Sequence, residues 1–397
     1  MLLADRAKNI SPSPTLSIDA QAKKMIAEGI NVVNFGVGEP DFETPENIKL
    51  AAKEAIDQGM TRYTPVAGIL PLRQAIVKKF ADDNGLTYEP GQIVVSAGAK
   101  HSLYNAFQVL CQAGDDVILP APYWVSYLEQ IKLTGAKPVV IPTRIENSFK
   151  LTPGELAAAI TPNTKAIILN SPSNPTGAVY SREELTALGE LLVKHNIAII
   201  SDEIYEKLLY DGNEHVSIAS LSPELKELTV VINGVSKTYA MTGWRIGYAA
   251  APPPVAKAMA DLQSHSTSNS TSIAQAATVE ALVGTQEPVK KMVAEFVKRR
   301  DYMVERMNAI PGVNCDRPGG AFYVFPEIKS LLGRSYDGTV INGASDLAAV
   351  LLEKAHVAIV PGVAFGDDTC FRLSYATSME NIKEGVDRIE KVITQLK

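Results

Sequence analysis

A single lysine stands on a turn of small residues just past the middle of the chain, in the stretch SKTYAMTGWRIGY (236–248). The preceding run LTVVIN is apolar enough to form a buried strand, so Lys237 would emerge among poorly hydrated neighbours. Burial disfavours the charged ammonium, which lowers the pKa of a lysine and makes its neutral amine nucleophilic. Such an amine forms Schiff bases with aldehydes. The alternative is an ordinary solvated turn lysine.

The stretch SAGAKHSLYN (96–105) has the features of an anion site. A predicted strand runs into Gly98, Ala99 and Lys100, which open a helix. The first N–H groups of a helix have no partners within it, and the helix dipole favours negative charge at that end. A tight turn with a surface lysine is the alternative.

Two further strand ends carry an amide, a carboxylate and a phenol. Asn174 follows the run KAIILN, and Asp202 and Tyr205 follow the run IAIIS. Ligands of open α/β sheets bind where the strands end, and a carboxylate buried there needs a cationic or hydrogen-bonding partner. The alternative for Asp202 is a helix N-cap.

Together these groups are the set that pyridoxal phosphate requires. The cofactor needs a lysine for its aldehyde, an acid for its pyridine nitrogen, a donor for its phenolate oxygen, and an anion cradle with an arginine for its phosphate. Lys237, Asp202, Tyr205 and Arg245 supply four of these parts, and residues 98–100 supply the cradle. The sequence therefore predicts a pyridoxal phosphate site.

The elements that must position these groups alternate between strands and helices. Seven short runs rich in β-branched residues suit strands of a mainly parallel sheet, namely 92–98, 116–120, 137–142, 165–170, 197–201, 228–233 and 245–250. Between them, one helix is predicted to begin with Thr44 as N-cap and to end at Gly59. Another is predicted to begin with a capping box made by Ser181 and Glu184.

The character of the chain changes after SHSTSNSTS (264–272), where a long helix at about 286–310 precedes short strands and a terminal helix. We therefore predict a large cofactor-binding α/β domain over residues 40–285. Residues 1–39 and 286–397 are predicted to form a smaller α+β domain with an N-terminal arm. The Ser/Thr-rich run is either a linker or a polar loop that borders the active site.

Composition excludes several classes of function. The 397 residues carry a formal net charge of −6, which gives no electrostatic reason to bind nucleic acid or an anionic membrane. No apolar run approaches the ~18 residues that span a bilayer. Three cysteines without a CxxC pair and five scattered histidines indicate a reducing compartment and no metal site. Without a signal-peptide pattern, we expect a cytoplasmic protein.

Seven segments, in order along nearly the whole chain, resemble those of class I pyridoxal-phosphate-dependent aminotransferases. They are NFGVGEPDFETP (34–45), RYTPVAGILPLRQAI (62–76), PAPYWVSY (120–127), NSPSNPTG (170–177), SDEIY (201–205), SKTYAMTGWRIGY (236–248) and FRLSYA (371–376). The resemblance is greatest to the bacterial-type aspartate aminotransferases. It implies the pyridoxal-phosphate-dependent transferase fold, an α/β fold whose seven-stranded, mainly parallel sheet is flanked by helices, with a smaller α+β domain.

The resemblance assigns catalytic roles to three residues. Lys237 binds the cofactor's aldehyde carbon and then moves a proton between the substrate Cα and the cofactor. Asp202 pairs with the pyridine nitrogen, and Tyr205 donates to the phenolate oxygen together with Asn174. The other implied cofactor contacts are Trp124 on the ring and Gly98, Ala99, Ser236 and Arg245 at the phosphate.

The resemblance also implies a homodimer with shared active sites, because Tyr63 is expected to reach the phosphate of the other subunit's cofactor. Arg372 is expected to bind the substrate α-carboxylate through a bidentate fork, next to Asn174, Trp124 and the Gly38 backbone. The peptide bonds before Pro122 and Pro175 are expected to be cis.

The second carboxylate of aspartate is expected to meet Lys100 and the hydroxyls of Ser13 and Thr15. The alternative for Ser13 and Thr15 is a polar N-terminal arm. Gly243 and Gly247 are expected to allow close backbone approach. Gly234 is a departure, since many relatives carry serine or threonine three residues before the lysine, and the phosphate site would lose one hydroxyl.

The implied reaction is L-aspartate plus 2-oxoglutarate to oxaloacetate plus L-glutamate, by a ping-pong mechanism. One alternative is a transaminase acting on prephenate, aromatic amino acids or alanine. A second is a lyase or synthase of the same fold, such as an aminocyclopropane carboxylate synthase. A third is a ligand-sensing regulator, which would need a DNA-binding module that the segment before residue 34 is not expected to hold.

Overall fold

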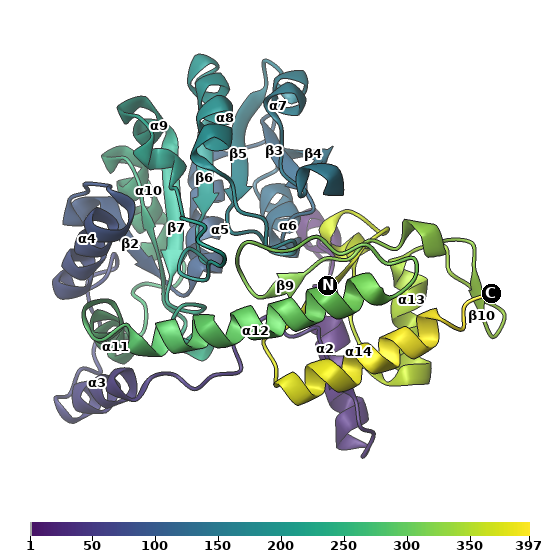
Figure 1. Ribbon diagram of the computed structural model, residues 1–397. Helices are drawn as coiled ribbons and strands as arrows, with labels where there is room; N and C mark the ends of the chain where they lie inside the picture. Colours follow the sequence, from purple (N-terminus) through teal and green to yellow (C-terminus); the bar gives the residue numbers. More distant parts are fainter. Residues whose placement is uncertain (1) are drawn as a thin grey trace.

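Seven strands form one sheet in the order β2-β8-β7-β6-β5-β3-β4 in the computed structural model, which describes residues 2–397 (Figure 1). They are β2 (Ile93–Ser96), β3 (Asp116–Ala121), β4 (Lys137–Pro142), β5 (Thr164–Asn170), β6 (Ala198–Asp202), β7 (Thr229–Gly234) and β8 (Gly247–Ala250). Only β8 runs antiparallel to its neighbours. Each predicted run forms one strand, and the predicted mainly parallel seven-stranded sheet is confirmed.

Helices pack against both faces of this sheet. These helices are α3 (Glu46–Asp57), α4 (Leu70–Asn84), α5 (Ala99–Leu110), α6 (Val125–Leu133), α7 (Pro153–Ala159), α8 (Arg182–Lys194), α9 (Pro223–Leu228), α10 (Pro253–Ser264) and α11 (Ser272–Val283). The N-terminal arm before them carries α1 (Asp5–Lys8) and α2 (Pro14–Ala27). Side chains of a strand alternate between its faces. Ile93 and Val95 of β2 accordingly enter the core with α3, α4 and α11, whereas Val94 enters the core with α5, α6 and α10.

A second group of elements surrounds the long helix α12 (Glu287–Ala309), which Figure 1 shows running from below the large sheet to the side of α14 (Met379–Ile393). Its other members are β1 (Val33–Asn34), β9 (Tyr323–Val324), β10 (Ser335–Tyr336), β11 (Thr339–Val340), α13 (Ala344–Val350), β12 (Val357–Ala358), β13 (Val360–Pro361) and β14 (Phe371–Ser374). β13, β14 and β9 form an antiparallel sheet, and β1 pairs with β12. The division into two domains at residue 285 stays a prediction.

The two predicted helix starts had different outcomes. Ser181 and Glu184 form the predicted capping box of α8, each side chain accepting from the other's backbone N–H. The N-cap prediction for Thr44 is wrong, because α3 begins at Glu46 with Pro45 as N-cap. The Thr44 hydroxyl instead donates to the Ala240 carbonyl at 2.6 Å. This hydrogen bond connects the start of α3 to the loop that carries Lys237.

Within the described residues 2–397, three peptide bonds before proline are cis. Those before Pro122 and Pro175 confirm what the resemblance implies, and the bond between Ser171 and Pro172 is a third that was not predicted. Among residues 2–397, no helix is both long and apolar enough to cross a membrane.

Candidate active site

A cavity of about 510 Å³ opens where the strands of the large sheet end, beside the N-terminal arm and β14. The predicted site residues that line it are Ser13, Thr15, Gly38, Ala99, Lys100, Trp124, Asn174, Asp202, Tyr205, Ser236, Lys237, Arg245 and Arg372. Gly98 is not in the lining but is the N-cap of α5 next to it. Tyr63 is 92% exposed and lies outside this cavity. None of residues 264–272 lines this cavity of the single chain either. The Ser/Thr-rich run joins α10 to α11, and its relation to a shared site stays a prediction.

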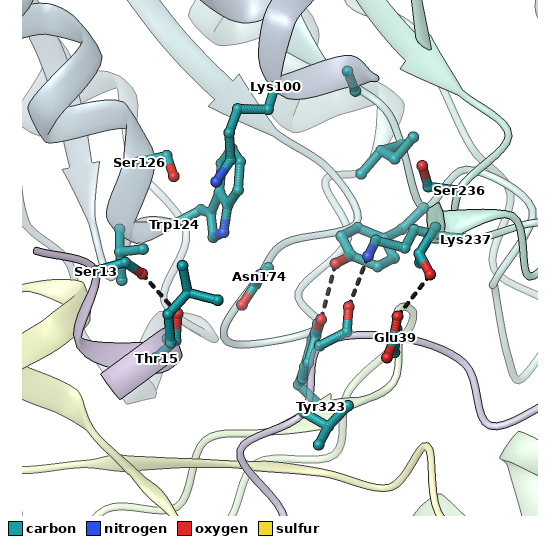
Figure 2. Close-up of a pocket in the computed structure, with 18 of the residues that line it drawn as sticks. Ser13, Thr15, Glu39, Lys100, Trp124, Ser126, Asn174, Ser236, Lys237 and Tyr323 are labelled. Carbon is teal, nitrogen blue, oxygen red and sulfur yellow. Dashed lines mark hydrogen bonds between the residues drawn. The ribbon is translucent and has the colours of Figure 1, made fainter. Parts of the chain in front are cut away.

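Lys237 projects into the cavity and donates from Nζ to the Gly38 carbonyl at 2.7 Å (Figure 2). Burial lowers the pKa of Lys237 to about 8, against the opposing effect of the Glu39 carboxylate. The positive charges of Arg245 and Arg372 lower that pKa further. The amine is therefore largely neutral and nucleophilic at mildly basic pH, as expected of a Schiff-base lysine.

Reaction of Lys237 with an aldehyde is expected to speed up with pH only as far as about pH 8. Below that pH each unit should raise the labelling rate about tenfold, because only the neutral amine reacts. The measurement is borohydride trapping of pyridoxal phosphate on the apo-protein, with peptide mapping at several pH values. Surface lysines in the same digest, with pKa values of about 10.4, provide the internal control. A Lys237 rate that keeps rising in parallel with them would contradict the assignment.

Asp202 ends β6 and is buried. Burial raises its pKa to about 6, although the Tyr127 hydroxyl donates to Oδ2 at 2.6 Å and the Ile204 N–H donates to Oδ1 at 3.2 Å. Such a carboxylate gains from a cationic partner in the cavity, which is what a protonated pyridine nitrogen supplies. The sequence reasoning missed Tyr127, whose only signal was its place on α6 within the segment PAPYWVSY.

The backbone around Asp202 and Tyr205 is anchored by two buried glutamates from the same loop. Glu203 accepts from Ser217 Oγ at 2.7 Å and lies 2.9 Å from His215 Nε2. Glu206 pairs with the buried Lys79 of α4. Because each charge has a partner, this network can remain buried and hold the loop after β6 in one conformation.

Arg372 lies on β14 and is 2% exposed. Its Nη1 donates to Asn174 Oδ1 at 2.9 Å and its Nη2 to the Gly36 carbonyl at 2.8 Å. Its Nε is buried and has no partner among residues 2–397, and burial lowers the pKa of the guanidinium. A buried cation without a counter-ion favours an anionic ligand, so the site fits a carboxylate.

The predicted anion cradle depends on two glycines. Gly98 has φ +89°, and a Cβ there would collide with the Arg245 guanidinium. A Cβ on Gly247 would collide with the Ala99 N–H. The glycines thus allow the Arg245 side chain and β8 to approach the start of α5. The expectation for Gly243 is wrong, because nothing would lie within 4 Å of a Cβ there.

The packing of β7 against β8 explains why a glycine stands at position 234. Gly234 pairs with Gly247 where β7 meets β8. A Cβ on Gly234 would lie 3.0 Å from the Gly247 Cα and 3.1 Å from the Ile246 carbonyl oxygen. The two strands are therefore packed too closely here for a side chain to enter without displacing backbone.

The far side of the cavity carries a cation and hydroxyl groups. Lys100 Nζ lies 4.8 Å from the centroid of the Trp124 ring, and the pKa of Lys100 is lowered by desolvation and then by Arg245. Ser13 and Thr15, at the start of α2, hydrogen-bond to each other through their hydroxyls at 3.0 Å. Figure 2 shows these side chains across the cavity from Lys237.

Comparisons with known proteins agree with this arrangement. Residues 30–389 match the family described as aminotransferase class I and II. The chain is 53% identical over 391 residues to an aspartate aminotransferase of Geobacillus stearothermophilus, covering 98% of each chain. It is 48% identical to an aspartate/prephenate aminotransferase of Cereibacter sphaeroides, again covering 98% of each.

Solved structures are similar as well. The crystal structure of an aspartate aminotransferase from Rhizobium meliloti is 46% identical, covers 100% of both chains and superposes with a TM-score of 0.97. The structure of the Thermus thermophilus aspartate aminotransferase with maleate is 43% identical in sequence and superposes with a TM-score of 0.92. The match covers 99% of this chain and 100% of that one. These matches extend over nearly the full length of the chain and share its fold. The chain belongs to the class I and II aminotransferase family.

Proposed function

We propose that the protein is an aspartate aminotransferase, which transfers the amino group of L-aspartate to 2-oxoglutarate and yields oxaloacetate and L-glutamate in a ping-pong reaction. The observation that carries the proposal is one cavity that holds a buried, incompletely paired arginine, a lysine of lowered pKa and a second cation, Lys100. A C4 dicarboxylic amino acid needs a cationic site for each carboxylate and a base at its Cα. Relatives at 49–53% identity bear the name aspartate aminotransferase.

The residues of the cavity fit pyridoxal phosphate. Lys237 offers a neutral amine, Asp202 offers a buried carboxylate that lacks a cationic partner, and Gly98 with Arg245 leaves an anion cradle at the start of α5. When bound, the cofactor supplies an electron sink for the pair released as the substrate Cα–H bond breaks.

The chain's own groups perform the remaining tasks. Arg372 binds the α-carboxylate and thereby fixes the substrate Cα within the cavity. Lys237 takes the proton from the substrate Cα and returns it to the carbon of the cofactor that carried the aldehyde. An amine with a pKa of about 8 suits both steps. Asp202 would stabilise positive charge on the ring nitrogen, and Tyr205 and Asn174 would donate to the ring oxygen.

We also propose a cytoplasmic homodimer in which Tyr63 completes the phosphate site of the partner subunit. The support is its 92% exposure in the single chain and its position outside the chain's own cavity. The two-domain division at residue 285 and the roles of the remaining site residues are part of the same proposal.

Lys100→Ala is expected to lower kcat/KM for aspartate by about 10- to 100-fold, the worth of one hydrogen bond between charged groups. It should change alanine turnover little, because alanine has no second carboxylate. The measurement is kcat/KM for both donors with purified enzyme, with Lys132→Ala as the control, a cation on α6 that does not line the cavity. Equal losses for aspartate and alanine would remove the distal-carboxylate role.

Prephenate is the second candidate substrate. Relatives at 46–48% identity are named aspartate/prephenate aminotransferases, two of them as probable ones. The deciding experiment is a panel of amino acceptors with L-aspartate as donor. Prephenate turnover within about tenfold of 2-oxoglutarate turnover, a difference of about 1.4 kcal/mol in barrier, would assign both activities to this chain.

A further inference from the structure

One tyrosine of the smaller sheet, Tyr323 on β9, contacts both ends of the site. Its ring lies against Arg372, with the guanidinium carbon 4.5 Å from the ring centroid. Its hydroxyl lies 3.0 Å from the Tyr205 hydroxyl (Figure 2). Pairing of Tyr323 with Ser374 places it on the strand next to the one that carries Arg372. With 1% of its surface exposed, Tyr323 holds these contacts within the core.

The same hydroxyl also packs against the segment that receives Lys237. A Cβ on Gly38 would lie 3.3 Å from the Tyr323 hydroxyl, and the Gly38 carbonyl accepts the hydrogen bond from Lys237. Tyr323 therefore lies beside three residues of the predicted site that come from distant parts of the sequence. It is among the lining residues of the cavity.

The hydrogen bond between the two tyrosines can run in either direction, because each is a hydroxyl. Within residues 2–397, neither hydroxyl has another hydrogen-bond partner. Each hydroxyl has one proton to donate and can also accept. If Tyr205 donated to Tyr323, the Tyr205 hydroxyl would have no proton left to donate to a ligand in the cavity. The Arg372 guanidinium lies over the ring of Tyr323, so its charge favours Tyr323 as the donor. With Tyr323 as the donor, Tyr205 keeps its own proton for an acceptor in the cavity.

We propose that Tyr323 is a positioning residue that joins the two halves of the site: its hydroxyl donates to Tyr205 and keeps Tyr205 a donor toward the cofactor oxygen, and its ring supports Arg372. The inference rests on the proposed function. A donor to the ring oxygen stabilises the anionic oxygen and so lowers the pH at which the bound cofactor loses its proton. Tyr323 would strengthen that effect through Tyr205 without touching the oxygen itself.

Tyr323→Phe removes the hydroxyl and keeps the ring. The readout is the pH midpoint of the visible absorption band of the holoenzyme, without substrate. We expect the midpoint to rise by about 0.5 to 1 pH unit, the effect of weakening one hydrogen bond. Affinity for maleate, measured by spectral titration, should stay within about twofold of the wild type, because the ring still supports Arg372.

Tyr323→Leu removes both functions. It should shift the midpoint as Tyr323→Phe does and also weaken maleate binding by about 3- to 30-fold, through loss of the contact between cation and ring. Tyr375→Phe is the matched control, because Tyr375 is a buried tyrosine of the same core that does not line the cavity, and its hydroxyl donates to the Ala321 carbonyl at 3.3 Å. It should leave both readouts unchanged.

The outcomes separate this inference from the proposed function. An unmoved midpoint in Tyr323→Phe, with a normal band in the wild type, would overturn the role of the hydroxyl. Equal maleate affinity in Tyr323→Leu and Tyr323→Phe would overturn the role of the ring. A wild type that forms no band with pyridoxal phosphate would overturn the proposed function, and this inference with it. Since Tyr323→Phe is isosteric, the test of the hydroxyl stands even if Tyr323→Leu fails to fold.

Discussion

Replacing Lys237 by alanine is expected to lower kcat for aspartate by about 10⁴-fold or more, the upper range for a positioned acid–base group. The same change removes the amine that attaches the cofactor, so two functions are lost with one side chain. The remaining cavity would still hold Arg372 and Asp202, so substrate and cofactor binding should persist at reduced affinity. The measurements are steady-state turnover and borohydride trapping followed by peptide mapping.

The control for this experiment is Lys257→Ala, which removes an exposed lysine of α10. It should leave both turnover and the labelled peptide unchanged. A wild-type holoenzyme in which the peptide that contains Lys237 is not the main site of trapped cofactor would refute the assignment. Turnover by Lys237→Ala within tenfold of the wild type would refute it as well.

Replacing Asp202 by asparagine is expected to lower kcat/KM by about 10²- to 10³-fold, as does removal of one preorganised electrostatic group in other enzymes. Asparagine keeps the shape of the side chain, and its carbonyl oxygen can still accept from the Ile204 N–H. It cannot supply the negative charge that stabilises a protonated ring nitrogen. The measurement is kcat/KM for aspartate at saturating cofactor, so that weaker cofactor binding does not enter the result.

The apo-protein provides the control, because without the cofactor the ionised Asp202 carboxylate destabilises the folded state. The pKa of Asp202 is about 6 in the folded protein, above the value of about 3.9 in an unfolded chain. The folded state thus binds this proton more tightly, and the associated stability is present below about pH 4 and lost as the pH rises through about 6. Apo Asp202→Asn should not lose stability as the pH rises through about 6, so its melting temperature at neutral pH should be no lower than that of the apo wild type. A lower melting temperature would point to misfolding as the cause of inactivity.

Local patterns in the sequence determined the strands and the chemistry at their ends. Apolar runs such as KAIILN and LTVVIN can satisfy their backbone and bury both faces only within a covered sheet. Polar residues that follow such runs reach the same edge when the strands are parallel. Lys237, Asp202 and Asn174 could therefore be placed together before the structure was known, and all three line one cavity. Their individual roles stay predictions.

Tertiary structure alone decided which further side chains meet these residues. Tyr127 and Tyr323 lie on α6 and β9, and nothing in their local sequence indicates that one hydroxyl reaches Asp202 and the other Tyr205. The contact between Tyr323 and Tyr205 joins residues 118 positions apart. Such contacts depend on how the elements pack, which periodicity does not encode.

Glycine and capping residues show the same limit. A Cβ on Gly234 would meet the Gly247 Cα where β7 approaches β8, and no local pattern indicated this contact. The loss of a hydroxyl at the phosphate site stays a prediction. Thr44 had the local signal of an N-cap, but its hydroxyl bonds to the loop at Ala240. In both cases a group distant in sequence competes for the same space or the same hydrogen bond. The sequence therefore determined the sheet and the reacting groups, whereas only the packed structure decided the spacing and the hydrogen-bond partners around them.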